Sequence, residues 1–246
     1  MRTLLAAFMM FTRLPLWRWV EVDKSYYKGI LHYWCIVGFL TGTVTWGVLW
    51  LASQVLPLLP SCILAVAARL LLTGALHEDG LADFFDGFGG GHDRESRLRI
   101  MKDSHIGSYG VIGLIVYFML YVSLLYSLPS GCLAASIIAA DVLSKLITAA
   151  MIDTLPYART EETSKTKVLY SRLNYIRFNL ITAGCAAILF FIGASFWGLI
   201  PALAMSIGLR FYFKRKLNGY TGDCCGAAVL FTETAFYIGT LIACQL

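Results

Sequence analysis

Long apolar runs separated by charged segments constrain the fold of this chain more than any other feature. Each run approaches the roughly 20 residues that a helix needs to cross a bilayer. Seven such runs lie at about 31–56, 61–77, 110–128, 131–152, 179–197, 198–213 and 225–246. Only 14% of the 246 residues are charged, against about 25% in typical soluble domains. The pattern predicts an all-α integral membrane protein, because helices satisfy their backbone hydrogen bonds inside lipid.

The distribution of basic residues predicts how these helices are oriented. Of the 20 Lys and Arg residues, 18 lie in the segments 1–30, 78–109, 153–179 and 210–223. By the positive-inside rule these segments and the N-terminus are cytoplasmic, and the C-terminus is outside. We expect about seven transmembrane helices in a polytopic bundle. Six are possible, because the fifth and sixth runs are short enough to form one bent hairpin.

The N-terminal residues are expected to lie at the membrane surface rather than to form a cleavable signal. Arg13 interrupts a short apolar stretch at 4–11, and Trp17 and Trp19 suit the headgroup region of a bilayer. We therefore expect an N-terminal interfacial helix in contact with lipid. No linker or repeat divides the chain, so residues 1–246 are predicted to form a single membrane domain. The net charge of +5 is explained by topology, and no nucleic-acid partner is expected.

An acidic segment after the second apolar run gives the strongest indication of chemistry. It reads His77-Glu78-Asp79-Gly80-Leu81-Ala82-Asp83-Phe84-Phe85-Asp86-Gly87. In a helix, Asp79, Asp83 and Asp86 would share one face, where like charges repel by about 0.2–0.5 kcal/mol per pair in water. Mg²⁺ would remove this conflict, since it binds through one or two carboxylates and completes its shell with phosphate oxygens. The segment thus predicts metal-assisted phosphoryl transfer, with a solvated acidic helix start as the structural alternative. The predicted metal ligands are Glu78, Asp79, Asp83 and Asp86.

Two further polar segments are candidates for the same site. The segment 100–110 contains Lys102 and Ser104, which are expected to neutralise and bind a diphosphate. Asp103, between them, is expected to complete the metal shell or to orient an attacking hydroxyl. Asp223 stands at the start of the last apolar run, where a carboxylate caps a helix or binds a ligand or metal. The general base is therefore predicted to be Asp103 or Asp223, and the sequence does not decide between them.

Charged residues inside the apolar runs suggest a different class of function. They are Arg69, Asp141, Lys145 and Glu233. Intramembrane charges often mark the pathway of a cation-coupled or proton-coupled transporter. Asp141 and Lys145 are four residues apart and are equally explained as a neutralising pair on one helix. A transporter also leaves the acidic segment unexplained.

Taken together, the polar segments resemble those of the cobalamin synthase family. The matching residues are Phe11-Thr12-Arg13-Leu14-Pro15, His77 to Asp83 with Asp86-Gly87, Ile100 to Ser104 with Gly107 and Gly110, Tyr157-Ala158-Arg159, and Thr221-Gly222-Asp223 with Gly226-Ala227. Two positions depart from the pattern: Ser144-Lys145 stands where the family is expected to have Ser-Arg, and the turn at 160–165 has no glycine. The resemblance otherwise covers nearly the whole chain.

The resemblance implies a Mg²⁺-dependent adenosylcobinamide-GDP ribazoletransferase in the inner membrane of a prokaryote, with its active site cytoplasmic. A hydroxyl of α-ribazole, or of its 5′-phosphate, attacks the phosphorus attached to cobinamide, and GMP leaves. The product is adenosylcobalamin or its 5′-phosphate. A CDP-alcohol phosphotransferase is the alternative, but its D-x-x-D-G-x-x-A-R motif fails because Asp83 follows Ala82 where Arg is required.

The implied active site draws on three cytoplasmic segments, about 77–110, 153–178 and 214–224. The residues expected to bind substrate are Arg13, His77, Lys102, Ser104, Arg159 and Thr221. The oligomeric state is left open, with a homo-oligomer as one option.

Overall fold

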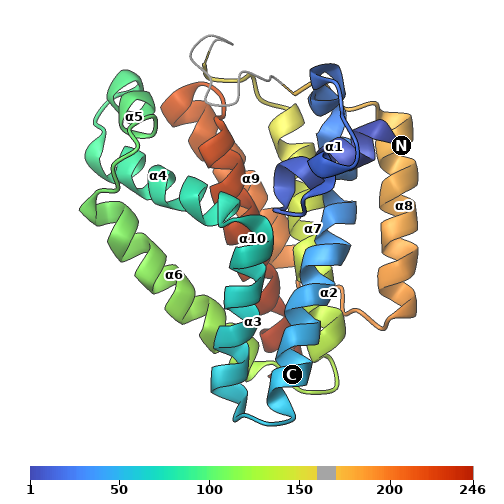
Figure 1. Cartoon of the computed structure of the whole chain (residues 1–246). Coiled ribbons are helices and arrows are strands. Elements are labelled where there is room, and N and C mark those ends of the chain that lie inside the picture. The colour runs from blue at the N-terminus through green and yellow to red at the C-terminus, as the bar shows by residue number, and fades with distance from the viewer. Residues whose placement is uncertain (160–169, 246) are drawn as a thin grey trace.

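The computed structural model describes residues 1–159 and 170–245, which are mostly helical. In this part of the chain the α-helices are α1 (Arg2–Phe11), α2 (Trp34–Ser53), α3 (Leu58–Thr73), α4 (Leu76–Gly90), α5 (Arg94–Ile100), α6 (Ser108–Ser127), α7 (Leu133–Asp153), α8 (Tyr175–Phe191), α9 (Leu199–Leu217) and α10 (Gly222–Gln245). Two 3₁₀ helices, η1 (Leu16–Arg18) and η2 (Lys24–Tyr33), connect α1 to α2. The helices form one bundle, which α4 crosses, and the two chain ends lie at opposite ends of it (Figure 1). The all-α prediction is confirmed.

Each predicted apolar run corresponds to one helix, from α2 and α3 to α6 through α10. Among the described residues, four helical segments are long and apolar enough to cross a membrane, and α3 with α4 would make a fifth. Helix α8 has only 17 residues, and the last turn of α9 carries three basic residues. A polytopic membrane protein is therefore confirmed in outline, whereas the number of spans stays a prediction.

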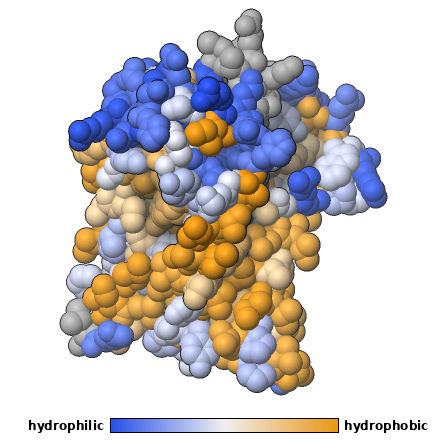
Figure 2. Space-filling view, turned by 90° about the vertical axis from the view of Figure 1, so that its left-hand side faces the viewer, coloured by the Kyte–Doolittle hydropathy of each residue, from blue (hydrophilic) through white to orange (hydrophobic). Residues whose placement is uncertain are grey.

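The surface separates into a hydrophilic end and an apolar body. Figure 2 shows hydrophilic residues gathered at the upper end of the molecule and hydrophobic residues over most of the face below. Helix α1 lies near this end and buries Ala6, Ala7 and Phe11, while Trp17 and Trp19 remain exposed. The predicted N-terminal helix is therefore present, and its position at the headgroups stays a prediction.

Helices α2 and α7 cross closely because α2 carries glycine at the contact. A Cβ atom at Gly38 would lie 2.8 Å from the Cα of Val142, and one at Gly42 would lie 3.0 Å from the Cα of Ile138. Glycines four residues apart are a frequent contact between membrane helices, since they let two backbones approach. This contact places the polar residues of α7 deep inside the bundle.

The chain turns sharply between α3 and α4. Gly74 and Ala75 both adopt the left-handed conformation, with φ of 67° and 54°, and the two helices meet at 92°. One continuous helix would place Arg69, Thr73 and His77 on a single face. Because of the turn, His77 does not share a helix face with Arg69 and Thr73. The turn sends the acidic segment across the bundle as α4, instead of along its axis (Figure 1).

Four charged residues in the interior form two ion pairs. Arg69 of α3 binds Glu233 of α10 through two hydrogen bonds of 2.6 and 2.7 Å. Lys145 binds Asp141, one turn earlier on α7. The hydroxyl of Thr41 donates to the same Asp141 at 2.5 Å. Because each charge is neutralised by a partner, no transported ion is needed to explain these residues.

Candidate active site

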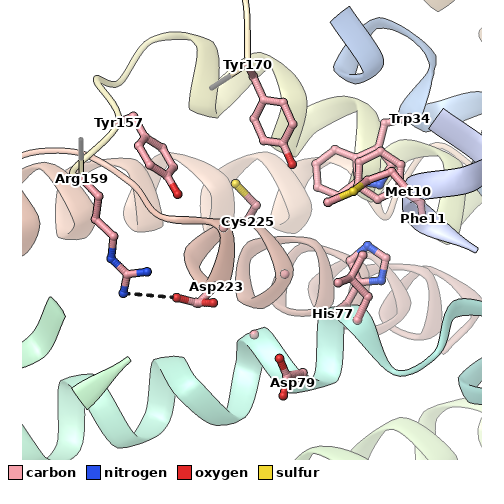
Figure 3. A pocket seen from close by; sticks show the side chains of 14 residues that line it. Met10, Phe11, Trp34, His77, Asp79, Tyr157, Arg159, Tyr170, Asp223 and Cys225 are labelled. Atoms are coloured by element: carbon pink, nitrogen blue, oxygen red, sulfur yellow. Dashed lines mark ion pairs between the residues drawn. The ribbon is translucent and has the colours of Figure 1, made fainter. Parts of the chain in front are cut away.

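A cavity of about 220 Å³ lies between α4 and α10 and extends to α1 and α2. Figure 3 shows charged side chains on one side of it, from Asp79, Arg159 and Asp223. Aromatic rings from Phe11 and Trp34 form the opposite side. The three charged residues come from α4, from the segment after α7 and from α10, so the fold brings distant parts of the sequence to one cavity.

Glycine residues allow α4 and α10 to approach closely beside the cavity. A Cβ atom at Gly80 would lie 3.0 Å from the backbone oxygen of Asp223, and one at Gly226 would lie 2.9 Å from that of His77. Real Cβ atoms rarely come so close to backbone atoms, which cannot move aside as a flexible side chain can. The two glycines therefore determine how near Asp79 and Asp223 can lie.

Replacing Gly226 with Ala should destabilise the protein, because the added methyl group would press against the backbone of His77. Overpacking of this kind costs about 1–3 kcal/mol. We expect a lower midpoint of thermal unfolding for the purified protein in detergent. Gly184→Ala on α8 is the matched control, since a Cβ there meets no atom of the described residues within 4 Å. Equal midpoints for the two variants would contradict a tight contact between α4 and α10.

Asp223 lies in the first turn of α10, two residues after Thr221, whose side chain caps the helix. The hydroxyl of Thr221 accepts a hydrogen bond from the Cys224 amide at 3.2 Å and donates to Asp223 Oδ2 at 3.4 Å. Arg159 Nη2 lies 3.7 Å from the same Oδ2 atom and donates to the Leu98 carbonyl at 3.1 Å. Thr221, predicted to bind substrate, is buried and orients Asp223 from within the helix start.

Backbone hydrogen bonds hold Arg159 opposite α10. The Ala158 amide donates to the Tyr220 carbonyl at 2.8 Å, and the Tyr220 amide donates to the Pro156 carbonyl at 3.0 Å. Arg94 of α5 donates to the carbonyls of Leu217 and Ala158, each at 2.8 Å. Arg94 thus ties α5 and the end of α9 to the segment that carries Arg159.

The carboxylates predicted to bind Mg²⁺ lie in different surroundings along α4. Asp79 lines the cavity, and Asp83 lies one turn further along the helix. Glu78 is buried and is not among the residues that line the cavity, and its Oε2 atom has no hydrogen-bond partner among the described residues. Its carboxylate lies near enough to the interior ion pairs to interact electrostatically with Arg69, Glu233 and Lys145.

Asp86 is engaged with the start of α6. Its Oδ2 atom accepts a hydrogen bond from the Gly107 amide at 2.7 Å, and its Oδ1 atom accepts one from the Gly110 amide at 2.8 Å. These amides belong to the helix start, where backbone donors lack partners within the helix. The residues that the structure describes contain no group of three or more His, Cys, Asp or Glu arranged to hold a metal. The four carboxylates are thus not gathered around one point, and the magnesium site stays a prediction.

Four other predicted site residues lie outside the cavity. Lys102, Asp103 and Ser104 occupy the exposed connection between α5 and α6. The ring Nδ1 of His105 lies 2.7 Å from the Asp103 carboxylate, and the His105 amide donates to the same carboxylate at 3.1 Å. These two contacts hold the pKa of Asp103 below its ordinary value. Arg13 is exposed and packs its side chain against Gly74 at the turn between α3 and α4.

The aromatic side of the cavity is not evident from the sequence. Phe11 belongs to a segment that resembles the family, but only Arg13 of that segment was expected to bind substrate. Trp34 starts an apolar helix, and Tyr170 follows the undescribed residues 160–169. Aromatic residues at the end of an apolar run are equally typical of the membrane interface, so their position gave no signal of a ligand site.

Comparisons with known proteins agree on one family. Residues 3–241 match the model of the family described as cobalamin-5-phosphate synthase. A curated protein of Shewanella sp. (strain W3-18-1), named adenosylcobinamide-GDP ribazoletransferase, is 41% identical over 97% of this chain and 93% of its own length. A protein of the same name from Shewanella baltica (strain OS185) is 40% identical over 97% of this chain and 93% of its own length. Another, from Shewanella oneidensis, is 40% identical over 94% of this chain and 90% of its own length. No solved structure matches the chain. The chain belongs to the cobalamin-5-phosphate synthase family.

Proposed function

We propose that this chain is an adenosylcobinamide-GDP ribazoletransferase and that its reaction takes place in the cavity between α4 and α10. Relatives that are 40–41% identical over nearly the full length carry this name. In the reaction, a hydroxyl oxygen of α-ribazole or its 5′-phosphate bonds to the phosphorus attached to cobinamide. The bond from that phosphorus to GMP breaks, and the hydroxyl proton passes to a base. The observation that carries the proposal is the convergence of Asp79, Arg159 and Asp223 on one cavity.

Arg159 suits the binding of a diphosphate. Its guanidinium group is nearly buried, with 4% of the side chain exposed, and it faces the cavity. Hydrogen bonds from Arg to phosphate are charge-assisted, and they strengthen where water is excluded. We assign Arg159 to the diphosphate of adenosylcobinamide-GDP, where it would offset the charge that develops on departing GMP.

Asp223 is the better candidate for the general base. A base must come within hydrogen-bond reach of the hydroxyl that it deprotonates, so position is considered before acidity. Asp223 lines the cavity, whereas Asp103 lies in an exposed connection and is hydrogen-bonded to His105. We therefore assign proton removal to Asp223 and keep Asp103 outside the reacting groups.

The carboxylates on α4 suit a Mg²⁺ ion that is shared with the substrate. Mg²⁺ needs only one or two protein carboxylates when phosphate oxygens complete its shell, so a preformed group of three or more ligands is not required. Asp79, which faces the cavity, and Asp83, one turn away, would hold the ion. When bound, it would supply positive charge next to the diphosphate.

Removing Mg²⁺ should abolish the transfer of α-ribazole. The experiment uses purified protein in lipid vesicles, supplies α-ribazole and adenosylcobinamide-GDP, and measures GMP release. Chelation by EDTA should stop GMP release, and added Mg²⁺ should restore it. Asp79→Asn should raise the Mg²⁺ concentration needed for half-maximal activity. Undiminished release after exhaustive chelation would contradict the metal proposal, and no release by the wild-type protein with Mg²⁺ present would contradict the function.

We also place the cavity on the cytoplasmic side of the inner membrane. The basic segments 78–109 and 210–223 include nearly all of the acidic segment and Asp223, and the positive-inside rule assigns such segments to the cytoplasm. Exposed apolar residues on the body of the bundle, among them Ile112, Met119 and Leu180, suit contact with lipid tails. Labelling of a cysteine introduced at Ser104 by an impermeant reagent, in inside-out but not right-side-out vesicles, would test this orientation.

A further inference from the structure

The side of the cavity opposite Asp223 is built from stacked aromatic rings. The centroids of Phe11 and Trp34 lie 4.8 Å apart with an interplanar angle of 16°. The ring of His77 lies 5.8 Å from that of Trp34 at 17° and 6.3 Å from that of Phe11 at 15°. Three segments, α1, α2 and α4, thus present nearly parallel rings, with Tyr170 nearby (Figure 3). Such an arrangement suits a flat aromatic ligand, which gains both buried area and a favourable ring contact.

Polar atoms on this side of the cavity have no hydrogen-bond partner among the described residues. They are Nδ1 and Nε2 of His77 and Nε1 of Trp34. Only 2% of His77 and 1% of Trp34 is exposed. A buried polar atom without a partner costs about 1–3 kcal/mol. His77 lines the cavity, so a ligand with one or two polar atoms could satisfy its ring nitrogens.

The two substrates of the proposed reaction offer two different flat groups. Guanine has donors and acceptors around most of its edge, and each would need a partner inside the protein. The dimethylbenzimidazole of α-ribazole is apolar apart from one free ring nitrogen, which accepts a single hydrogen bond. The walls on this side are Met10, Phe11, Trp34, Leu76 and Tyr170. Besides the ring nitrogens of His77, their polar side-chain groups are the indole N–H of Trp34 and the hydroxyl of Tyr170, which are fewer than the edge of guanine would need.

We propose that Phe11, Trp34 and His77 form the binding site for the benzimidazole base of α-ribazole, an inference that rests on the proposed function. The base stacks on the aromatic rings, and an N–H of His77 or Trp34 donates to its free nitrogen. The ribose then extends toward the opposite side of the cavity, where Asp223 meets the attacking hydroxyl. The guanine of the other substrate binds elsewhere.

Substitution of His77 and Trp34 by Phe tests this assignment, because each change keeps an aromatic ring and removes the ring nitrogens. Calorimetric titration of the lipid-reconstituted protein should show about a tenfold weaker Kd for α-ribazole in His77→Phe, equivalent to about 1.4 kcal/mol. The Kd for GMP should stay unchanged. In transfer assays the KM for α-ribazole should rise, while that for adenosylcobinamide-GDP holds. Trp50→Phe is the matched control, since Trp50 lies on the same helix as Trp34 with 51% of its surface exposed.

Other outcomes would overturn the assignment. Unchanged affinity for α-ribazole in both variants, or weaker binding of GMP instead, would exclude the aromatic side as the site of the base. If the variants fail to fold, the wild-type protein supplies the test, since it should bind α-ribazole at least tenfold more tightly than an α-riboside of adenine. Equal affinities would refute the proposal. The binding measurement needs no turnover, so its failure is distinguishable from failure of the transferase function, which the release of GMP reports.

Discussion

Replacing Asp223 with Asn should lower the rate of α-ribazole transfer by about 10²–10⁴-fold, the usual contribution of a general base. Asn has nearly the same shape and can still accept the hydrogen bond that Thr221 donates. It cannot take a proton from the attacking hydroxyl, and it loses the ion pair with Arg159. GMP release in a single turnover, measured with saturating substrates in vesicles, reports the chemical step directly.

Asp103→Asn is the matched control for this experiment. It removes the same charge from the connection between α5 and α6, where the carboxylate is exposed and lies outside the cavity. We expect its turnover to stay close to that of the wild type. If Asp103→Asn instead lost activity and Asp223→Asn retained it, the assignment of the base would be reversed. Thermal unfolding of both variants separates a chemical defect from misfolding.

The helices could be predicted from the sequence because the bilayer leaves few alternatives. Each apolar run became a helix, since unpaired backbone groups are costly in lipid. The turn between α3 and α4 could not be foreseen from the same pattern. Gly74 was compatible with a continuing helix, and a left-handed Ala75 beside it is an uncommon conformation that depends on surrounding contacts. Helix periodicity was therefore a poor guide to the neighbours of His77.

The candidate site was predicted in part. The acidic segment forms a helix beside the cavity, and the Thr-Gly-Asp sequence contains Asp223, which lines it. Spacing on one helix does not show which face meets which neighbour. In the fold Asp79 lines the cavity, whereas the adjacent Glu78 is buried outside it. Asp86 accepts hydrogen bonds from amides more than 20 residues away, a contact that no local pattern contains.

Replacing Glu233 with Gln should destabilise the protein severely. Arg69 and Glu233 are 2% and 0% exposed, and two hydrogen bonds join them. Removing one member of a buried pair leaves the other charge uncompensated, at a cost of about 3–5 kcal/mol. We expect a large fall in the midpoint of thermal unfolding and poor recovery of folded protein. Glu95→Gln, which makes the same change at an exposed position of α5, should leave the midpoint unchanged.

A double substitution distinguishes the energy of the pair from the cost of breaking it. Replacing both members of a buried ion pair by apolar residues of similar size is often neutral or stabilising, because neither charge then has to be desolvated. Arg69→Met with Glu233→Leu should therefore recover much of the stability that either change alone removes. Tyr121 also donates to Glu233. The recovery of stability will therefore be incomplete, because the double variant deprives the Tyr121 hydroxyl of this acceptor. If the double variant were as unstable as the sum of the single ones, the two residues would contribute independently. The pair would then matter for shape and packing rather than for mutual neutralisation.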